Sequence, residues 1–374
     1  MTAGDITARV SHAEETAMRR AVELAAVALG RTSPNPVVGC VVLDPAGRPV
    51  GEGFHRGAGH PHAEVEALTA AGPRARGATA VVTLEPCAHQ GRTGPCAEAL
   101  LTAGVARVLY AVPDPTPGAA GGARRLREAG VEVVPGVLRT DAERVNELWL
   151  TAVRRSRPCV TWKFGGTLDG RSAAPDGTSR WITGQPARED VHVLRAAHDA
   201  VLVGTGTLRA DDPHLGLRHA VPGDPPLRVV LDRTGAIRAD ARVLDDAAPT
   251  LVVIGHGTPH PRLPDPHEVL EVPATGDGLD IAALTGELYR RGLRSLLLEG
   301  GAGLAAAFAA RGLLDRVVAY VAPVLLGSGG RPVLDGFGAR TLDEGLRLHL
   351  DEVRRMGDDV RLVLRAEPLP GEAG

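Results

Sequence analysis

The alternation of apolar and polar positions predicts an α/β protein. In the first 150 residues, short and continuous apolar runs alternate with amphipathic segments, and turn residues separate the two. Continuous apolar runs are typical of strands that are buried on both faces, and the amphipathic segments are typical of helices that cover such strands. We expect strands at 37–43, 50–55, 78–87, 106–114 and 131–138, and helices at 12–30, 63–71, from 96, at 124–129 and at 141–153. This order predicts a three-layer domain.

The second half of the chain repeats the α/β pattern without any internal sequence repeat. Its expected strands are 159–166, the run after 199, 226–232, 249–255, 295–299, a run within 315–327 and a last run from 359, and its expected helices are 185–197, 281–291 and an Ala-rich helix after 303. The Pro- and Gly-rich stretch 258–280 is expected to be loop. The stretch "RRSRP", 154–158, could bind phosphate, but a solvated linker that ends at its proline is the simpler interpretation. Because 374 residues exceed one typical core, we predict two domains, 1–153 and 154–374.

Composition narrows the functional classes. The net charge is −3 and aromatic residues make up 3%, so neither a basic surface nor many stacking rings are available for nucleic acid. No apolar run reaches the length of a membrane span, and the first ten residues lack the apolar core of a secretory signal. Four cysteines are too few for a disulfide framework in a chain of this length. A cytoplasmic enzyme that binds neither nucleic acid nor membrane is therefore expected.

The tripeptide His-Ala-Glu occurs twice, and its first copy has a structural explanation. Ser11 precedes Glu14 by three residues, which is the spacing of a capping box at the start of a helix. Gly30 offers the left-handed conformation that ends many helices. This copy is therefore predicted to begin the helix 12–30 and to take no part in chemistry.

The second copy stands among potential metal ligands. His62 precedes a predicted helix, Cys87 follows a predicted strand, and Cys96 begins another helix. One imidazole and two thiolates match a zinc site with an open fourth position, where zinc would hold a reactive water. Glu64, two residues beyond the histidine, is placed to take the proton of that water and pass it to a substrate nitrogen. His-x-Glu followed by Pro-Cys and a further cysteine is the pattern of zinc deaminases.

Three alternatives remain open for these residues. His62, Cys87 and Cys96 could be a satisfied histidine and two core thiols, as we expect of Cys40 and Cys159. The protein could also be a non-catalytic binding protein with a structural zinc, although such a site has no need of Glu64. It could be a base deaminase acting on nucleic acid with an appended nucleotide-binding domain. That class usually has two residues between the cysteines, whereas eight stand here.

Two glycine-rich segments in the second half suggest a bound nucleotide. Gly204 and Gly206 follow a strand, but Arg209 stands where the fingerprint Gly-x-Gly-x-x-Gly requires its last glycine, so by itself this segment is read as a tight turn. The segment from Gly300 to Gly303 joins a buried strand to an Ala-rich helix. Backbone N–H groups and the helix N-terminus there could hold a pyrophosphate, although a close-packed strand–helix turn would look similar.

The motifs "SPNPVVGCVV", "HPHAEVEAL", "TLEPCAHQGRTGPC" and "DPTP" resemble the deaminase half of the RibD family of bifunctional riboflavin biosynthesis proteins. The resemblance implies a cytidine-deaminase-like domain that deaminates a phosphorylated diaminohydroxypyrimidine ribosylamine. It also implies that substrate is bound by Asn35, His89, Arg92 and Thr93. Three features depart from the family pattern and affect peripheral contacts: Glu66 for His, Thr116 for Asn, and a shortened segment at Gly121 and Gly122.

The motifs "KFGGTLDGR", "SRWIT", "TLRADDPHLGLR", "LDRTG", "LEGGAGL" and "APVLLG" resemble the reductase half of the same family. This resemblance implies a dihydrofolate-reductase-like domain that uses NADPH to convert the ribosyl group to a ribityl chain. The cofactor residues that it implies are Gly165, Trp181, Thr207, Asp211, Arg233, Gly301, Ala302, Gly303, Leu304 and Ala305. The substrate residues that it implies are Lys163, Ser179, Leu215, Arg218 and Glu299. We expect zinc and NADPH as cofactors, a small phosphorylated pyrimidine as the substrate, and a homo-oligomer.

Overall fold

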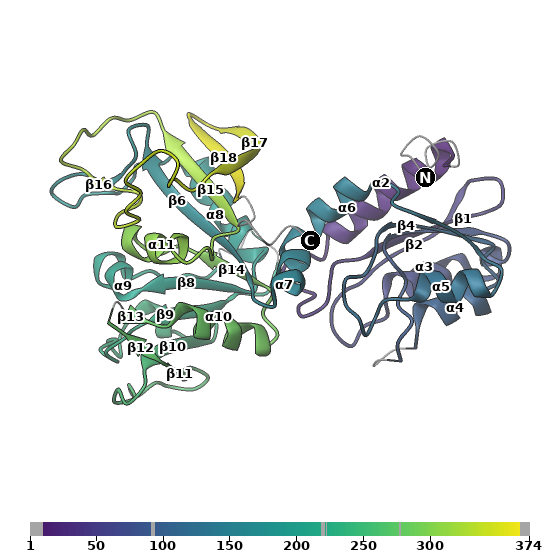
Figure 1. The fold of residues 1–374 in the computed structure, drawn as a ribbon, viewed down its shortest axis with the longest axis horizontal. Helices are drawn as coiled ribbons and strands as arrows, with labels where there is room; N and C mark the ends of the chain where they lie inside the picture. Colours follow the sequence, from purple (N-terminus) through teal and green to yellow (C-terminus); the bar gives the residue numbers. More distant parts are fainter. Residues whose placement is uncertain (1–9, 91–93, 218–220, 222, 277, 367–374) are drawn as a thin grey trace. The chain divides into compact units, whose positions relative to one another are not determined.

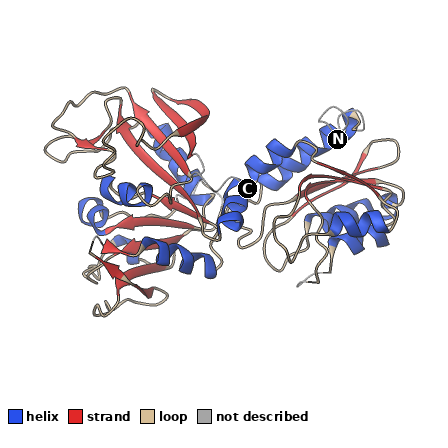
Figure 2. Ribbon diagram, viewed as in Figure 1, coloured by secondary structure: helices blue, strands red, loops and turns tan. Residues whose placement is uncertain are grey.

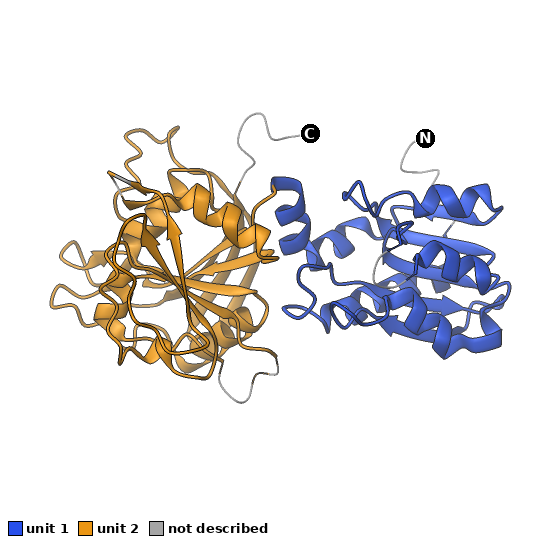
Figure 3. Cartoon of the chain, turned by 90° about the horizontal axis from the view of Figure 1, so that it is seen from below, with its two compact units in different colours: residues 1–155 blue, residues 156–374 orange. Residues whose placement is uncertain are grey.

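The computed structural model describes residues 10–90, 94–217, 221, 223–276 and 278–366. The chain divides into two compact units, residues 1–155 and 156–374, which Figure 3 colours separately. Among the described residues, none of the helices is both long enough and apolar enough to cross a membrane. The two units are described in turn.

The first unit is a five-stranded sheet between two layers of helices. The strand order is β2-β1-β3-β4-β5, in which β1 runs antiparallel to β2 and β3, while β3, β4 and β5 are parallel. Helices α2 and α6 cover one face and α3, α4 and α5 the other (Figures 1 and 2), which confirms the predicted three layers. The elements are α2 (His12–Ala26), β1 (Gly39–Leu43), β2 (Pro49–Phe54), α3 (Ala63–Ala71), a 3₁₀ turn (Gly72–Ala75), β3 (Thr79–Leu84), α4 (Cys96–Thr102), β4 (Arg107–Val112), α5 (Gly122–Glu128), β5 (Glu132–Pro135), α6 (Arg139–Val145) and α7 (Glu147–Arg155).

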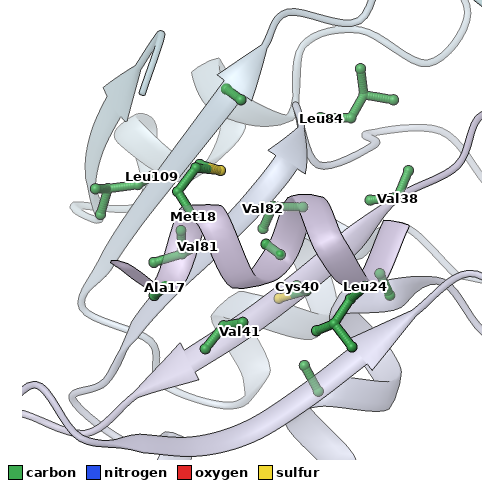
Figure 4. Packing of buried hydrophobic residues seen from close by; sticks show 14 of the residues in the cluster. Ala17, Met18, Leu24, Val38, Cys40, Val41, Val81, Val82, Leu84 and Leu109 are labelled. Atoms are coloured by element: carbon green, nitrogen blue, oxygen red, sulfur yellow. The ribbon is translucent and has the colours of Figure 1, made fainter. Parts of the chain in front are cut away.

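Helix α2 packs its apolar face onto the sheet. Met18, fully buried, lies in one cluster with Val41, Val81 and Leu109 from three neighbouring strands (Figure 4). Burial of such side chains contributes about 1.5–3 kcal/mol each, and it is this contribution that holds the helix in place. One part of the core therefore lies between α2 and the centre of the sheet, and a second cluster, with Leu100 and Leu126, lies on the face that α4 and α5 cover.

The predicted capping box is confirmed, but the helix that it begins is shorter than expected. The Ser11 N–H donates to Glu14 Oε2 at 2.7 Å, and the Glu14 N–H donates to Ser11 Oγ at 3.3 Å. Glu14 also accepts a hydrogen bond from Arg107 Nε at 2.7 Å, which ties the helix start to β4. The helix ends at Ala26, and Gly30, whose φ is 76°, lies in the turn that follows.

The prediction of a single helix at 141–153 is wrong, because the structure has two helices in this segment. Helices α6 and α7 meet at Asn146, which is buried and bonds through its side chain to the backbone of Val37. An asparagine side chain that bonds elsewhere in the chain favours a helix boundary over a helix interior. The apolar periodicity of the segment continues across the break, and the sequence prediction therefore missed it.

The second unit is built on a nine-stranded sheet in the order β11-β10-β9-β8-β14-β6-β15-β18-β17. Seven strands are parallel, and β18 and β17 are antiparallel at one edge. The elements are β6 (Cys159–Thr167), β7 (Arg171–Ala173), α8 (Gln185–Ala196), β8 (Ala200–Gly204), α9 (Thr205–Asp211), β9 (Leu227–Leu231), a 3₁₀ turn (Arg242–Leu244), β10 (Thr250–Gly255), β11 (Glu268–Val272), β12 (Ala274–Thr275), β13 (Gly278–Leu279), α10 (Ile281–Arg290), β14 (Ser295–Leu298), α11 (Ala302–Ala309), β15 (Arg316–Ala322), β16 (Arg331–Pro332), β17 (Leu348–Met356) and β18 (Asp359–Ala366).

Two expectations for the second unit are wrong. The stretch 258–280, expected to be loop, contains β11, which pairs in parallel with β10 at the sheet edge. Polar residues on an edge strand and the surrounding prolines hide its pattern. Gly204 and Gly206 do not form a tight turn, because Gly204 is the N-terminal cap of helix α9.

The topology points to the carboxyl ends of the central strands as the ligand-binding edge. Strand β14 lies between β8 and β6; the chain continues from β8 to β9 in one direction along the sheet and from β14 past β6 to β15 in the other. Open parallel sheets bind ligands outside the carboxyl ends of the strands at such a reversal of strand order. Two glycine-containing junctions, β8 to α9 and β14 to α11, lie at this edge.

Candidate active sites

Three side chains from separate elements of the first unit meet at one point. His62 is the N-terminal cap of α3, Cys87 follows β3, and Cys96 is the first residue of α4. His62 Nδ1 lies 3.1 Å from Cys96 Sγ and 3.7 Å from Cys87 Sγ. The three ligand atoms lie within 4.8 Å of one another, and no other group of this kind occurs among the described residues.

The electrostatics of the sulfur pair suit a divalent cation. The Cys96 thiol and the Cys96 backbone N–H both bond to Cys87 Sγ, the latter at 3.3 Å, and with His62 they lower the Cys87 pKa to about 4. The same hydrogen bond to Cys87, together with burial, raises the pKa of Cys96. The bond with Cys87 raises the pKa of His62. The two sulfur atoms therefore share one proton. A metal ion that displaces this proton would be bound by two thiolates and one imidazole.

Glu64 is buried beside this cluster. Its side chain is on the first turn of α3, the residue is 4% exposed, and burial raises the pKa of its carboxyl to about 7. A carboxyl group with this pKa can accept and return a proton near neutral pH. Two thiolates, one imidazole and a nearby proton carrier are the donor set of a catalytic zinc site with an open position, so these residues fit zinc.

Glu85 holds the segment that carries Cys87, and the sequence prediction missed this residue. Its carboxylate is buried and accepts the backbone N–H groups of Asp114, Gly121 and Ala123 at 3.0–3.3 Å. A Cβ at Gly122 would lie 1.7 Å from the Pro86 carbonyl oxygen, so α5 packs directly on the peptide before the ligand. The shortened glycine segment is therefore part of the support of the metal cluster.

His55 links the candidate pyrimidine contact to the metal ligand. Its Nδ1 donates to the Pro61 carbonyl at 3.1 Å, and its Nε2 accepts from Asn35 Nδ2 at 3.0 Å. Burial lowers the pKa of His55, in keeping with a neutral ring. The His55 ring meets the His62 ring edge-on, with centroids 5.2 Å apart. His89 is exposed near this site, while Arg92 and Thr93 lie outside the described residues.

In the second unit, three charged side chains form a buried cluster at the carboxyl end of β14. Lys163 Nζ, from β6, donates to Glu299 Oε2 at 3.0 Å. Arg195, from α8, donates to both oxygens of Glu299 at 2.6 and 3.1 Å. The two cations lower the pKa of Glu299 despite its burial, so the cluster keeps a net positive charge. The sequence analysis named Lys163 and Glu299 as substrate residues but missed Arg195, whose helix carries no motif.

The expected cofactor residues of α9 and α11 lie side by side. A Cβ at Gly301 would lie 4.0 Å from Thr207 Oγ1. Gly301 is the N-terminal cap of α11, whose first turn has neither a side-chain cap nor an acidic residue, and a Cβ at Gly303 would meet open space. The N-terminus of this helix is therefore free to receive an anionic group such as a pyrophosphate. The residues Ala302, Gly303, Leu304 and Ala305 form the first half of α11.

The remaining expected residues are less closely grouped. Arg180 joins the segment of Ser179 and Trp181 to α9, because it donates to the Asp211 carbonyl at 3.0 Å. Trp181 is 67% exposed beneath the guanidinium of Arg188. Three further positions are placed as follows: Gly165 lies in β6 beside Thr183, Arg233 is exposed after β9, and Leu215 has its side chain in the core. Arg218 lies outside the described residues.

Comparison with known proteins identifies the family. Residues 158–362 match the family model of the RibD C-terminal domain, and residues 10–112 match that of the cytidine and deoxycytidylate deaminase zinc-binding region. The riboflavin biosynthesis protein RibD of Mycobacterium tuberculosis is 44% identical over 359 residues, covering 94% of this chain and 97% of the relative. The chain belongs to the RibD family.

Solved RibD structures agree with this assignment. Acinetobacter baumannii RibD superposes with a TM-score of 0.86 at 39% identity, covering 95% of this chain and 99% of the other. The Thermotoga maritima diaminohydroxyphosphoribosylaminopyrimidine deaminase/5-amino-6-(5-phosphoribosylamino)uracil reductase gives the same TM-score at 34% identity, with the same shares covered.

Family membership settles the class of activity. RibD proteins are bifunctional deaminase–reductases of riboflavin biosynthesis, with a zinc-binding deaminase domain followed by a reductase domain that uses NADPH. RibD relatives match along nearly the whole chain, so the alternative of a nucleic-acid base deaminase with an appended domain is not favoured. The predicted fold class is likewise confirmed in both halves.

Proposed function

We propose that the unit of residues 1–155 deaminates 2,5-diamino-6-(5-phosphoribosylamino)pyrimidin-4-one and that the unit of residues 156–374 reduces the ribosyl group of the product to a ribityl chain. The observation that carries the first assignment is the meeting of His62, Cys87 and Cys96 beside the buried Glu64. The Thermotoga maritima structure is named for both of these steps, and it shares the fold along nearly the whole chain.

In the deamination, Glu64 is the proton carrier. His62, Cys87 and Cys96 would hold zinc, which when bound supplies an activated water near neutral pH. The carboxylate of Glu64 takes the proton of that water and delivers it to the amino nitrogen. The ring carbon gains an oxygen, its bond to nitrogen breaks, and ammonia leaves. Asn35 binds the pyrimidine, held in place by His55, and we assign binding of the phosphorylated substrate also to His89, Arg92 and Thr93.

The substitution Glu64→Gln tests this assignment. It keeps the shape of the side chain and the three ligands but removes the proton acceptor, so zinc content should stay at one ion per chain while ammonia release falls by about 10²–10⁴-fold. Glu66→Gln is the matched control, because Glu66 lies on the same helix and pairs with Arg56 instead. Full deaminase activity in Glu64→Gln would refute the role.

In the reduction, the chain binds and orients the reactants while NADPH supplies the hydride. The hydride goes to the ribose C1′ and a proton goes to the ring oxygen, so the ring opens to the ribityl chain. We assign Lys163, Glu299 and Arg195 to the substrate, because their net positive charge suits a phosphorylated ligand. Ser179, Leu215 through its backbone, and Arg218 complete this side. The cofactor side is formed by α9 and α11 with Gly165, Trp181, Asp211 and Arg233.

Loss of near-ultraviolet NADPH absorbance on addition of the deaminated pyrimidine tests the second assignment. We expect Glu299→Gln to lower kcat/KM by about 10²-fold, since it leaves two cations without their shared carboxylate. Glu268→Gln, on the exposed edge strand β11, is the control. No absorbance change with the unaltered protein would contradict the assignment.

We further propose that the protein is a cytoplasmic homo-oligomer acting on small molecules rather than on nucleic acid. Leu325 and Leu168 are 71% and 67% exposed, and the Leu168 N–H donates to the Val324 carbonyl at 2.9 Å, so the segments that carry these two exposed leucines lie side by side. Exposed apolar groups of this kind favour association between copies. Sedimentation velocity should give a mass above that of one chain, and Leu325→Asp should shift it toward the monomer.

A further inference from the structure

An arginine is fully buried in the second unit without any part in the cluster of Lys163, Glu299 and Arg195. Arg228, in β9, is 0% exposed. Its Nη1 donates to Asp245 Oδ1 at 2.6 Å, and its Nη2 donates to the backbone carbonyls of Asp245, at 2.6 Å, and Ala248. The arginine therefore fixes both the side chain and the backbone of Asp245.

The other oxygen of Asp245 extends the chain of bonds to a histidine. His214 Nε2 donates to Asp245 Oδ2 at 2.7 Å, and His214 Nδ1 accepts the backbone N–H of Gly216 at 3.1 Å. The histidine is thus oriented at both ring nitrogens. A Cβ at Gly216 would lie 2.5 Å from the His214 ring, so this close approach requires a glycine.

The segment held in this way borders the proposed substrate cluster. The Gly216 carbonyl accepts from Arg195 Nη1 at 3.1 Å, and the same guanidinium holds Glu299. Gly216 is therefore held by His214 at its N–H and by Arg195 at its carbonyl. Its neighbour Leu215 has a left-handed backbone, with φ at 59°, and its side chain is buried in the core. Such strain, of about 1–3 kcal/mol, persists only where the surroundings impose it.

A contribution to the stability of the fold is a weak explanation for the buried Arg228 and its pairing with Asp245. Arg228 is buried while Asp245 is partly exposed, and even where both partners are buried, replacement of an ion pair by apolar residues of similar volume is often neutral or stabilising. A strand such as β9, whose other residues are Leu, Val, Val and Leu, would accept an apolar residue at position 228. The hydrogen bonds from Arg228 lead instead, through Asp245 and His214, to the Gly216 peptide that Arg195 contacts. This path indicates a role in shaping the proposed substrate site.

We propose that Arg228, Asp245 and His214 are positioning residues of the reductase: they hold the Gly216 peptide against Arg195 and so set the shape of the pyrimidine-phosphate site. The proposal rests on the reductase assignment given above. It goes beyond that assignment, because none of the three residues needs to touch the substrate or NADPH.

Kinetics of two partly exposed members provide the first test. In His214→Ala and Asp245→Asn we expect the KM for the deaminated pyrimidine to rise about tenfold, with the KM for NADPH unchanged, since only uniform binding of one reactant is lost. His214→Asn should recover part of the loss, because an asparagine side chain can accept the N–H two residues further on. Asp240→Asn, which affects an exposed pair with Arg238, is the matched control.

Hydrogen–deuterium exchange of the segment 208–217 provides a test that needs no activity. We expect its amides to exchange about tenfold faster in His214→Ala and Asp245→Asn, and unchanged in Asp240→Asn. Unchanged exchange and an unchanged pyrimidine KM would overturn the proposal, and so would an equal rise of both KM values. Failure of the unaltered protein to oxidise NADPH would count against the reductase assignment, while the exchange result would still decide this inference.

Discussion

The side-chain amide of Asn146 satisfies both backbone groups of Val37, accepting its N–H at 3.0 Å and donating to its carbonyl at 2.6 Å. These two residues are 109 positions apart in the chain. The pair joins the break between α6 and α7 to the segment that carries Asn35. A second bond, from Trp149 Nε1 to the Pro34 carbonyl at 3.1 Å, supports the same segment.

Removal of this amide should destabilise the first unit. Asn146→Leu leaves a buried N–H and a buried carbonyl without partners, so we expect a loss of about 2–4 kcal/mol in the free energy of unfolding, measured with urea. Asn146→Asp should also be destabilised, because a carboxylate cannot donate to the Val37 carbonyl. Thr69→Ala, at an exposed helical position, should change stability by less than about 0.5 kcal/mol. Equal stability of Asn146→Leu and the unaltered protein would contradict the assigned role.

Gly122→Ala should weaken the hold on zinc. The new Cβ would lie 1.7 Å from the Pro86 carbonyl oxygen, so the peptide next to Cys87 must move. Displacement of a ligand's support typically lowers metal affinity by about 10–100-fold. Competition against a chelator measures this affinity. Gly118→Ala is the control, since a Cβ there meets nothing within 4 Å, and equal zinc affinity in the two variants would rule the explanation out.

His198 should make the second unit less stable in acid. Its Nδ1 donates to the Leu194 carbonyl at 2.7 Å and its Nε2 accepts from Thr161 Oγ1 at 2.9 Å, and burial lowers its pKa to about 4. This pKa lies below that of a histidine in the unfolded chain. The contribution of His198 to the free energy of unfolding is therefore complete above pH 6.5 and is lost as the pH falls toward 4.

The loss between pH 7 and pH 5 should be about 2 kcal/mol. We expect urea unfolding to show this difference for the unaltered protein and a smaller difference for His198→Gln. His256→Gln, at an exposed position, should follow the unaltered protein. A pH dependence in His198→Gln equal to that of the unaltered protein would show that another group is responsible.

Removal of the metal should separate the two activities. All three candidate ligands lie in the first unit, and no other cluster of suitable residues occurs in the described part of the second. Treatment with a chelator should therefore lower ammonia release by about a hundredfold or more, since the activated water is lost. NADPH oxidation with a substrate deaminated beforehand should continue at its original rate. Parallel loss of both activities would contradict this separation.

Sequence patterns predicted the features of the structure that depend on residues close together in the chain. The helix expected at 63–71 matches α3, because its apolar spacing agrees with its packing. The capping box of α2 formed as expected, since it involves only residues three positions apart. The candidate metal ligands also came together, because each stands at an element end on the same sheet edge. Their roles, like those of the other site residues, stay predictions.

Features set by distant contacts escaped prediction. The break at Asn146 depends on Val37, and the turn after Ala26 precedes the glycine that was expected to end the helix. Arg195 lies in an ordinary amphipathic helix, and only the folded chain shows that it meets Glu299, 104 positions away. Strand β11 was missed because its own residues do not indicate a strand. It forms by parallel pairing with β10.

The division at residue 155 has a genetic consequence. The proton carrier Glu64 belongs to one unit and the Lys163–Glu299 pair to the other, so damage to either leaves the other's chemistry in place. Two full-length mutants, each disabled in a different half, should therefore complement one another when co-expressed, because the first can release an intermediate that the second consumes. The two alleles would then restore the two-step pathway together, although each fails alone.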